Sequence, residues 1–172
     1  GMIAQEIVLK EPQLVRKMVL AGTGPAGGEG ISTVAGVTFL DILRGFFTGQ
    51  DAKQFLFFTR TPNGKEAGKA FLARLQERTE DRDKDISVSA FLAQLEALRT
   101  WGGKAPADLS VVKQPVLVVN GDDDRMVPTV NTHDLARRLS NSQLIIYPDA
   151  GHGGLFQFHV DFLRSALSFL AR

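Results

Sequence analysis

Two polar clusters in the second half of the sequence contain residue types that can move a proton. The first runs Gly121-Asp122-Asp123-Asp124-Arg125-Met126-Val127-Pro128, and the second runs Asp149-Ala150-Gly151-His152-Gly153-Gly154. Each follows a short apolar run of the kind that forms a buried parallel strand. Because reacting groups collect outside the carboxyl ends of parallel strands, we expect an acid of the first cluster and His152 to meet at one edge of a sheet.

A carboxylate beside a histidine is suited to general base catalysis. The carboxylate accepts the Nδ1–H of the imidazole, fixes its tautomer, and stabilises the imidazolium that forms when Nε2 takes a proton. Each residue also has a plain structural interpretation: Asp124 as the cap of a turn, and His152 as an ordinary loop histidine. His133 and His159 fall within expected helices, and we expect them at or near the surface.

The elements that would position these clusters follow from hydrophobic periodicity. Apolar runs at 17–21, 115–120 and 143–147 predict strands, and helical spacing predicts helices at 2–10, 130–139 and 155–170. From about 33 to 101 the spacing is helical throughout, with polar interruptions at 59–65 and 78–85. Alternating strands and helices predict an α/β fold whose strands are parallel neighbours.

The spacing of the two clusters resembles a known family pattern. Gly121-x-x-Asp124-x-x-Val127-Pro128, followed by Gly151-His152, is similar to the acid and histidine motifs of the α/β-hydrolase family, which has the chain order Ser, Asp, His. The resemblance assigns the triad acid to Asp124 and the triad histidine to His152. Asp122 and Asp123 precede the family position, and residues 1–6 resemble the helix that follows the nucleophile elbow G-x-S-x-G-G.

The resemblance implies the C-terminal half of an α/β-hydrolase fold, with about three parallel strands, flanking helices and an all-helical cap. Residues 1–32 and 102–172 would form a partial core, and residues 33–101 would form a cap inserted after the sixth strand. The implied activity is hydrolysis of an ester, a lactone or a similar carbonyl compound. Eight of the twelve phenylalanines lie between positions 39 and 91, so the cap has an apolar face of its own. Such a face is more often plain core than substrate pocket, and in this family it can be both. The substrate that the resemblance implies is a small apolar carbonyl compound.

The nucleophile of this family has no counterpart in the sequence. No G-x-S-x-G motif occurs, so Gly1 is either the last glycine of such an elbow or a tag remnant before Met2. We expect this chain alone to be inactive. Two hypotheses remain: a working hydrolase whose missing part lies upstream or on another chain, and a non-catalytic remnant that folds and binds.

The sequence also contains residues that fit a dinucleotide-binding site or a metal site. Gly22-Thr23-Gly24-Pro25-Ala26-Gly27 matches the G-x-G-x-x-G pattern of dinucleotide-binding domains, with Asp41 about twenty residues further on. That pattern needs a helix that starts inside it, whereas Gly28-Glu29-Gly30 follows here. A metal site formed by His152, His159 and Asp161 is the other alternative. We expect no cofactor and no metal, and a flexible loop at 22–32.

Composition limits the partners of the protein. Twenty basic and nineteen acidic residues give a net charge of +1, so charge favours neither a nucleic-acid nor a membrane partner. There are no cysteines, no apolar run approaches the roughly 18 residues that span a bilayer, and residues 1–6 do not resemble a signal peptide. On these grounds we expect a cytoplasmic protein. We also expect a homodimer, because the strand at 17–21 would have an open edge beside the apolar helix at 2–10.

Overall fold

The computed structural model describes residues 1–171 and contains a sheet of three parallel strands. These are β1 (Met18–Ala21), β2 (Val116–Gly121) and β3 (Ser142–Tyr147), in the order β1-β2-β3. Met18 pairs with Val116, and Val116 pairs with Ser142, so the three strands start level with one another. The strands and their parallel order agree with the sequence prediction to within one residue at most ends.

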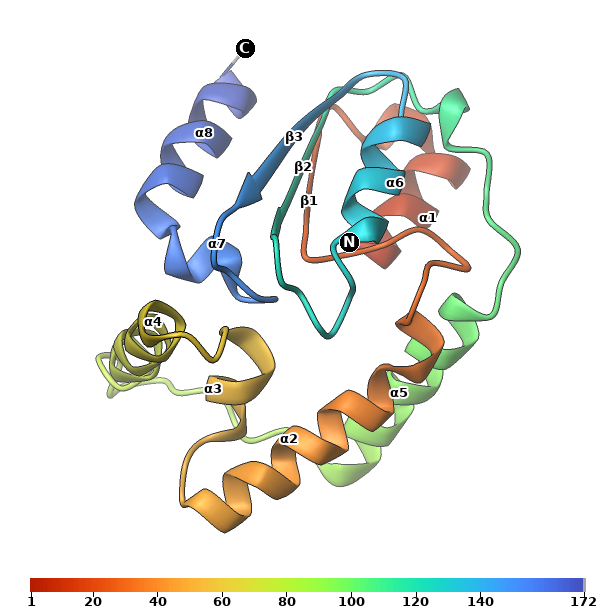
Figure 1. Ribbon diagram of the computed structural model, residues 1–172. Helices are drawn as coiled ribbons and strands as arrows, with labels where there is room; N and C mark the ends of the chain where they lie inside the picture. The colour runs from red at the N-terminus through yellow and green to blue at the C-terminus, as the bar shows by residue number, and fades with distance from the viewer. Residues whose placement is uncertain (172) are drawn as a thin grey trace.

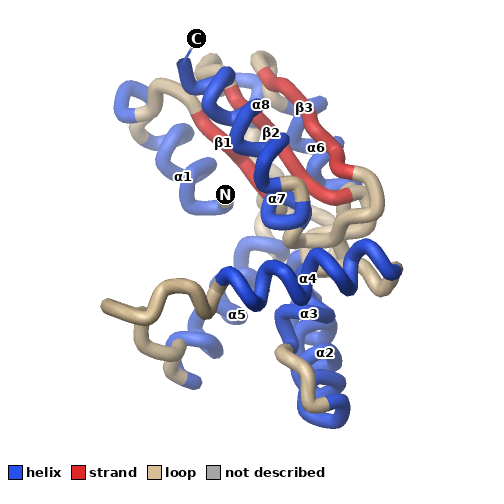
Figure 2. The backbone as a smooth tube through the Cα atoms, turned by 90° about the vertical axis from the view of Figure 1, so that its left-hand side faces the viewer, coloured by secondary structure: helices blue, strands red, loops and turns tan. Residues whose placement is uncertain are grey.

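Helices cover both faces of this sheet, as Figures 1 and 2 show. Alternate residues of β2 point to opposite faces: Val116 and Val118 pack in one core with α1 (Met2–Lys10) and α6 (Val130–Arg138). Leu117 and Val119 pack in a second core with α8 (His159–Ala171). A strand buried on both faces reads as a continuous apolar run, which explains the sequence of β2.

The stretch between β1 and β2 is helical and lies beyond the carboxyl ends of the strands (Figure 1). Its elements are η2 (Ile31–Thr33), α2 (Val34–Thr48), α3 (Ala52–Phe57), α4 (Pro62–Arg74) and α5 (Val88–Gly102). Two short 3₁₀ turns elsewhere, η1 (Pro12–Leu14) and η3 (Leu109–Val111), precede β1 and β2. We call residues 31–102 the helical segment.

Two helix boundaries differ from the sequence prediction. The expected interruption at 59–65 is partly helical, because Thr61 caps α4 by accepting a hydrogen bond from Gly64 N–H, and Pro62 is suited to the first turn. The expected final helix is divided at Phe158 into α7 (Gly154–Gln157) and α8. The ring of Phe158 stacks on Tyr147 at 4.8 Å, and this packing accompanies the break.

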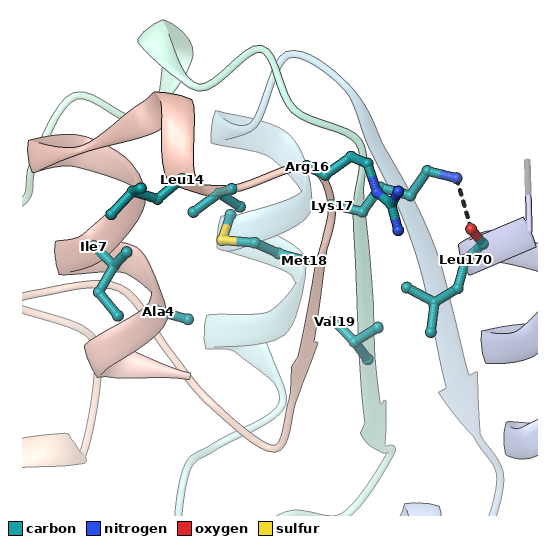
Figure 3. A pocket seen from close by; sticks show the side chains of 9 residues that line it. Ala4, Ile7, Leu14, Arg16, Lys17, Met18, Val19 and Leu170 are labelled. Atoms are coloured by element: carbon teal, nitrogen blue, oxygen red, sulfur yellow. Dashed lines mark hydrogen bonds between the residues drawn. The ribbon is translucent and has the colours of Figure 1, made fainter.

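The outer edge of β1 has no partner strand among residues 1–171. A groove of about 410 Å³ runs along it, lined by Ile7 and Leu14 on one side and by Leu170 on the other (Figure 3). Lys17 closes one end of the groove, where its ammonium donates to the carbonyl oxygens of Phe169 (2.9 Å) and Leu170 (3.1 Å). An open edge beside apolar side chains was expected from the sequence.

One helical stretch is long and apolar enough to cross a membrane. Within residues 1–171, Ile31–Thr48 has a mean hydropathy of 1.3 over 18 residues, which differs from the sequence prediction that no apolar run approaches that length. Length and hydropathy are weak support for a membrane span, because a core helix of a globular protein passes the same test. The stretch also contains Asp41, which is buried and paired with Arg125.

Candidate functional site

Asp124 and His152 meet at the carboxyl end of the sheet. Asp124 lies in the turn after β2, His152 lies in the loop after β3, and Oδ2 of Asp124 is 2.8 Å from Nδ1 of His152. The Asp124 side chain is fully buried, whereas the imidazole is one-quarter exposed. The predicted approach of these two side chains is therefore confirmed, and Nε2 of His152 makes no hydrogen bond within residues 1–171.

The two oxygens of the Asp124 carboxylate have different partners. Oδ1 accepts hydrogen bonds from the backbone N–H groups of Met126 (2.9 Å) and Val127 (3.0 Å), so it caps the turn. Oδ2 remains for His152. The cap of the turn and the contact with His152 therefore use different oxygens of one carboxylate, and the turn fixes the position of the oxygen that faces the imidazole. Asp122 instead accepts from Ala150 N–H, at 3.2 Å.

Gly22 and Phe57 form the surroundings of the His152 ring. A Cβ atom at Gly22, which has φ +56°, would lie 3.1 Å from Cε1 of the ring. The Phe57 ring centroid is 5.8 Å away on the helical segment. The carbonyl oxygen of Phe57 accepts a 2.7 Å hydrogen bond from Gly153 N–H. The imidazole is therefore held between the loop after β1 and the C-terminal end of α3.

Asp149 joins the loop that carries His152 to the helical segment through hydrogen bonds. Its carboxylate accepts from the hydroxyls of Thr61 (2.8 and 2.9 Å) and Thr59 (3.0 Å) and from the amide of Asn63 (3.1 Å). These bonds, with that of Thr61 foremost, lower the pKa of Asp149 below its ordinary value. Its φ of +50° lies in the left-handed region that aspartate tolerates.

The sequence alone does not reveal this role of Asp149. The signal was an aspartate three residues before the histidine, in the left-handed turn position where Asp and Asn are enriched. Its partners lie about 90 residues away, however, and no local pattern reveals them.

A second interaction joins α2 to the turn that carries Asp124, which we call the acid turn. Arg125, the residue after Asp124, places Nη1 at 3.0 Å from Oδ2 of Asp41, whose side chain is only 3% exposed. The same nitrogen lies 3.5 Å from the carbonyl oxygen of Phe55. Both loops that carry the Asp124–His152 pair are thus attached to the helical segment, one by Arg125 and one by Asp149.

A cavity of about 760 Å³ lies beside His152. Its wall is mainly apolar and combines residues of α1, η2, α2 and α5, among them Met2, Ile31, Val34, Leu98 and Trp101. Its polar lining includes Glu6, Lys10 and Lys104, and the ammonium of each lysine is 3.1 Å from the Glu6 carboxylate. These two bonds, with that of Lys104 foremost, lower the pKa of Glu6. The start of α1, at Gly1 and Met2, opens into the same cavity.

The structure does not support the dinucleotide alternative. No helix begins within Gly22–Gly27, and the first helical turn starts only at Ile31. The glycines serve close packing instead, since a Cβ atom at Gly24 would lie 2.7 Å from Ile31 and 2.9 Å from Asn131. Asp41 lies inside α2 and is paired with Arg125, so it is not at a strand end. Thr23 and Ala26 of this loop are buried.

The residues of the alternative metal site have other partners. His159 lies at the start of α8 with Nδ1 at 3.2 Å from the carbonyl oxygen of Phe156, and Asp161 pairs with Arg164 at 3.1 Å. Within residues 1–171 no three His, Cys, Asp or Glu side chains are grouped as metal ligands.

The fold and the Asp124–His152 pair point to the α/β-hydrolase class of proteins. Comparisons with known proteins agree with that class. The sequence matches the family described as alpha/beta hydrolase fold over residues 1–158, and the chain belongs to that family. It is 31% identical over 177 residues to a 2-hydroxy-6-oxononadienedioate/2-hydroxy-6-oxononatrienedioate hydrolase of Klebsiella pneumoniae subsp. pneumoniae, covering all of this chain and 59% of that protein. It is 25% identical to a pimeloyl-[acyl-carrier protein] methyl ester esterase of Nitrosomonas europaea, covering 95% and 65%.

Solved structures show the same fold. An alpha/beta hydrolase fold protein from Chitinophaga pinensis superposes with a TM-score of 0.89 at 34% identity, over 99% of this chain and 61% of that one. A putative non-heme bromoperoxidase from Mycobacterium tuberculosis H37Rv has a TM-score of 0.68 at 22% identity, over 98% and 62%. The chain spans about three fifths of the length of these relatives.

Proposed function

We propose that the protein contributes the acid and the base of a hydrolase site that acts on a carbonyl compound. The observation that carries this proposal is the 2.8 Å contact between Asp124 Oδ2 and His152 Nδ1, beside a mainly apolar cavity. In the proposed mechanism Nε2 of His152 takes the proton of a nucleophile and later gives it to the leaving group, while Asp124 holds the neutral ring as its Nδ1–H tautomer.

The nucleophile in this proposal is a serine from outside the 172 residues, either on preceding polypeptide or on another chain. No serine is among the residues that line the cavity, and no G-x-S-x-G occurs in the sequence. Gly1 and Met2 line the cavity, so a segment joined to Gly1 would enter it beside His152.

The substrate class that we propose is a small, largely apolar ester, lactone or similar carbonyl compound. The cavity wall supports this assignment, and relatives are named as hydrolases of oxo-dienoic acids and as a methyl ester esterase. We further propose that the helical segment is the cap of this site, within the division of the chain at 33–101. Its residues form one wall of the cavity and fasten both loops of the Asp124–His152 pair.

A non-catalytic binding protein is the second candidate. It is favoured by one observation, the cavity that lacks a serine.

A homodimer through the open β1 edge and α1, in a cytoplasmic location, also stays a proposal. Its support is the groove along β1 and the exposed side chain of Ile3 on α1.

Two measurements test the catalytic proposal. The purified chain is assayed for hydrolysis of p-nitrophenyl butyrate and for labelling by a fluorophosphonate probe. Negligible turnover and no labelling are expected, because positioned groups without a nucleophile leave only a small residual effect. Stoichiometric labelling of one of its own serines would overturn the assignment of the nucleophile to an outside segment.

The reading frame upstream of the Met2 codon discriminates the two candidates. An in-frame G-x-S-x-G supports the hydrolase. The polypeptide extended through that motif should then react with the probe, and His152→Gln in it should abolish the reaction. An upstream frame without such a motif favours the binding protein.

A further inference from the structure

A basic pocket separate from the cavity at His152 lies within the helical segment. It has a volume of about 310 Å³ and is bounded by the C-terminal end of α2, by α3 and by the first half of α4. Figures 1 and 2 show these three elements side by side, at the end of the molecule away from the core helices α1 and α6. None of its lining residues also lines the cavity at His152.

Four cationic side chains line this basic pocket, and no carboxylate does. They are Arg44 on α2, Arg60 before α4, and Lys65 and Lys69 on α4. Lys65 and Lys69 are one helical turn apart, so they project from the same face of α4. Arg44 is held in place by the ring of Phe55, whose centroid is 4.7 Å from its guanidinium carbon.

The four cations are not neutralised by the protein. None of them has an ion-pair partner among residues 1–171, whereas Lys53 on the neighbouring helix α3 pairs with Asp51 at 3.0 Å. Glu66, although it lies beside Lys65 in sequence, faces a different hollow together with Asp149. In a chain whose net charge is only +1, this pocket concentrates positive charge in a concave site.

Close packing of the helices holds the pocket in shape. Gly64 and Gly68 of α4 lie so near Thr59 and Gln54 that a Cβ atom at either glycine would overlap those side chains. Gln54 is buried and its amide faces the Gly64 carbonyl oxygen, at 3.5 Å. The backbone that carries the cations is therefore fixed before any ligand arrives, which lowers the entropic cost of binding.

Arginine and lysine together suit a phosphate group. A guanidinium presents paired N–H donors that match two phosphate oxygens, and lysine adds a mobile point charge. A singly charged carboxylate would leave most of the four cations unmatched. We propose that this basic pocket binds a phosphate group that carries two or more negative charges, and that it does so independently of the Asp124–His152 pair.

The phosphate can belong to a soluble compound or to a lipid headgroup. Phe46 and Phe47 of α2, beside the pocket residue Thr48, are 81% and 76% exposed. An apolar surface next to a phosphate site is suited to an amphiphile, but the phosphate chemistry is the same for both sources. The experiment therefore has an arm for each.

Pyrophosphate is titrated into the ¹⁵N-labelled protein, and backbone amide shifts are followed. In parallel, sedimentation is measured with phosphatidylcholine vesicles that contain or lack phosphatidic acid. We expect saturable shifts confined to residues 44–69 or sedimentation with the phosphatidic acid vesicles alone. Lys65→Gln with Lys69→Gln should weaken binding about tenfold or more. Lys53→Gln, which also removes one exposed cation from this region, should leave binding unchanged.

Each outcome decides the proposal. Binding in the pyrophosphate arm identifies a soluble phosphate compound as the ligand source, and binding in the vesicle arm alone identifies a headgroup. No saturable binding in either arm overturns the proposal. It is overturned equally if the Lys65/Lys69 variant binds as well as the parent. It is also overturned if Lys53→Gln, which removes one charge, weakens binding by half or more of the free-energy loss of the Lys65/Lys69 variant, which removes two, because binding would then follow net charge alone.

Discussion

Gly22 packs directly against the imidazole of His152. A Cβ atom at position 22 would lie 3.1 Å from Cε1 and 3.2 Å from Nδ1 of the ring. Gly22 also has φ +56°, in the region that side chains with a Cβ atom disfavour. Two separate requirements thus converge on glycine at this position: the backbone turn after β1 and the space occupied by His152.

Substitution of Gly22 by alanine should therefore have two effects. The left-handed backbone should cost about 1 kcal/mol of unfolding free energy. The new methyl group should also displace the His152 ring. Urea denaturation measures the first effect, and the ¹H–¹³C signals of the His152 ring measure the second.

Gly49→Ala is the matched control for that experiment. Gly49 has φ +65° at the end of α2, but nothing lies within 4 Å of an added Cβ atom. It should lose similar stability and leave the His152 signals unchanged. Equal changes of the His152 signals in both variants would contradict the packing role of Gly22.

Asp124→Asn should reverse the tautomer of His152. The asparagine oxygen can still accept from Met126 and Val127, so its amide N–H₂ faces Nδ1, which must then be an acceptor. Loss of the charged acceptor should cost about 2 kcal/mol of stability. The ¹⁵N shifts of the ring should move from the Nδ1–H to the Nε2–H pattern, while the signals of His159 serve as an internal reference. A ring that keeps Nδ1–H would show that Asp124 does not set the tautomer.

Asp149→Asn should lower stability in a pH-dependent way. The pKa of Asp149 is below its ordinary value, so its carboxylate stabilises the fold above the unfolded-state pKa, and this contribution fades as pH falls through the lower folded-state pKa. The difference in Tm between parent and variant should therefore be largest at pH 7 and should shrink below about pH 4. Asp81→Asn, at the other aspartate with positive φ (47°), should show no such gap. A gap that is the same at pH 7 and pH 3 would contradict the role of the charge.

Arg125 and Asp41 should show strong coupling in a double-mutant cycle. Arg125→Met leaves a carboxylate that is 3% exposed without its partner and should cost about 2–3 kcal/mol, reduced from the fully buried case because Arg125 is 36% exposed. The double variant Asp41→Asn/Arg125→Met should recover about 1 kcal/mol or more. Additive losses in urea denaturation would show that the ion pair does not hold the acid turn to α2.

The open β1 edge predicts a dimer in solution. Static light scattering at micromolar concentration should give about twice 18.7 kDa. Ile3→Glu on α1 should dissociate it, whereas Val88→Glu on α5 should not, although both side chains are about three-quarters exposed. A parent protein that stays monomeric contradicts the dimer.

Short-range signals were enough to predict the sheet and the Asp124–His152 pair. Apolar runs such as that of β2 indicate buried strands, and residues after adjacent parallel strands must meet, which brings Asp124 and His152 together. The break at Phe158 was missed because the stacking contact that accompanies it is with Tyr147 on another element, which periodicity does not reveal.

The attachments of the helical segment were missed for a related reason. The Asp41–Arg125 pair and the bonds of Asp149 to Thr59 and Thr61 join residues more than eighty positions apart. Periodicity describes one element at a time, so it predicts which face of α2 is polar but not which residue that face will meet.

The pairing of β1 with β2 has a consequence for how the chain is made. Met18 and Val116 are neighbours in the sheet although about a hundred residues separate them, and Lys17 reaches carbonyl groups 152 and 153 residues later. At about 5–20 residues per second, a ribosome that has just released β1 needs several more seconds to deliver β2, and longer to deliver α8. During that interval the edge of β1 that later pairs with β2 stays open, so an apolar strand is exposed to other chains for much longer than a strand whose partner follows in a hairpin.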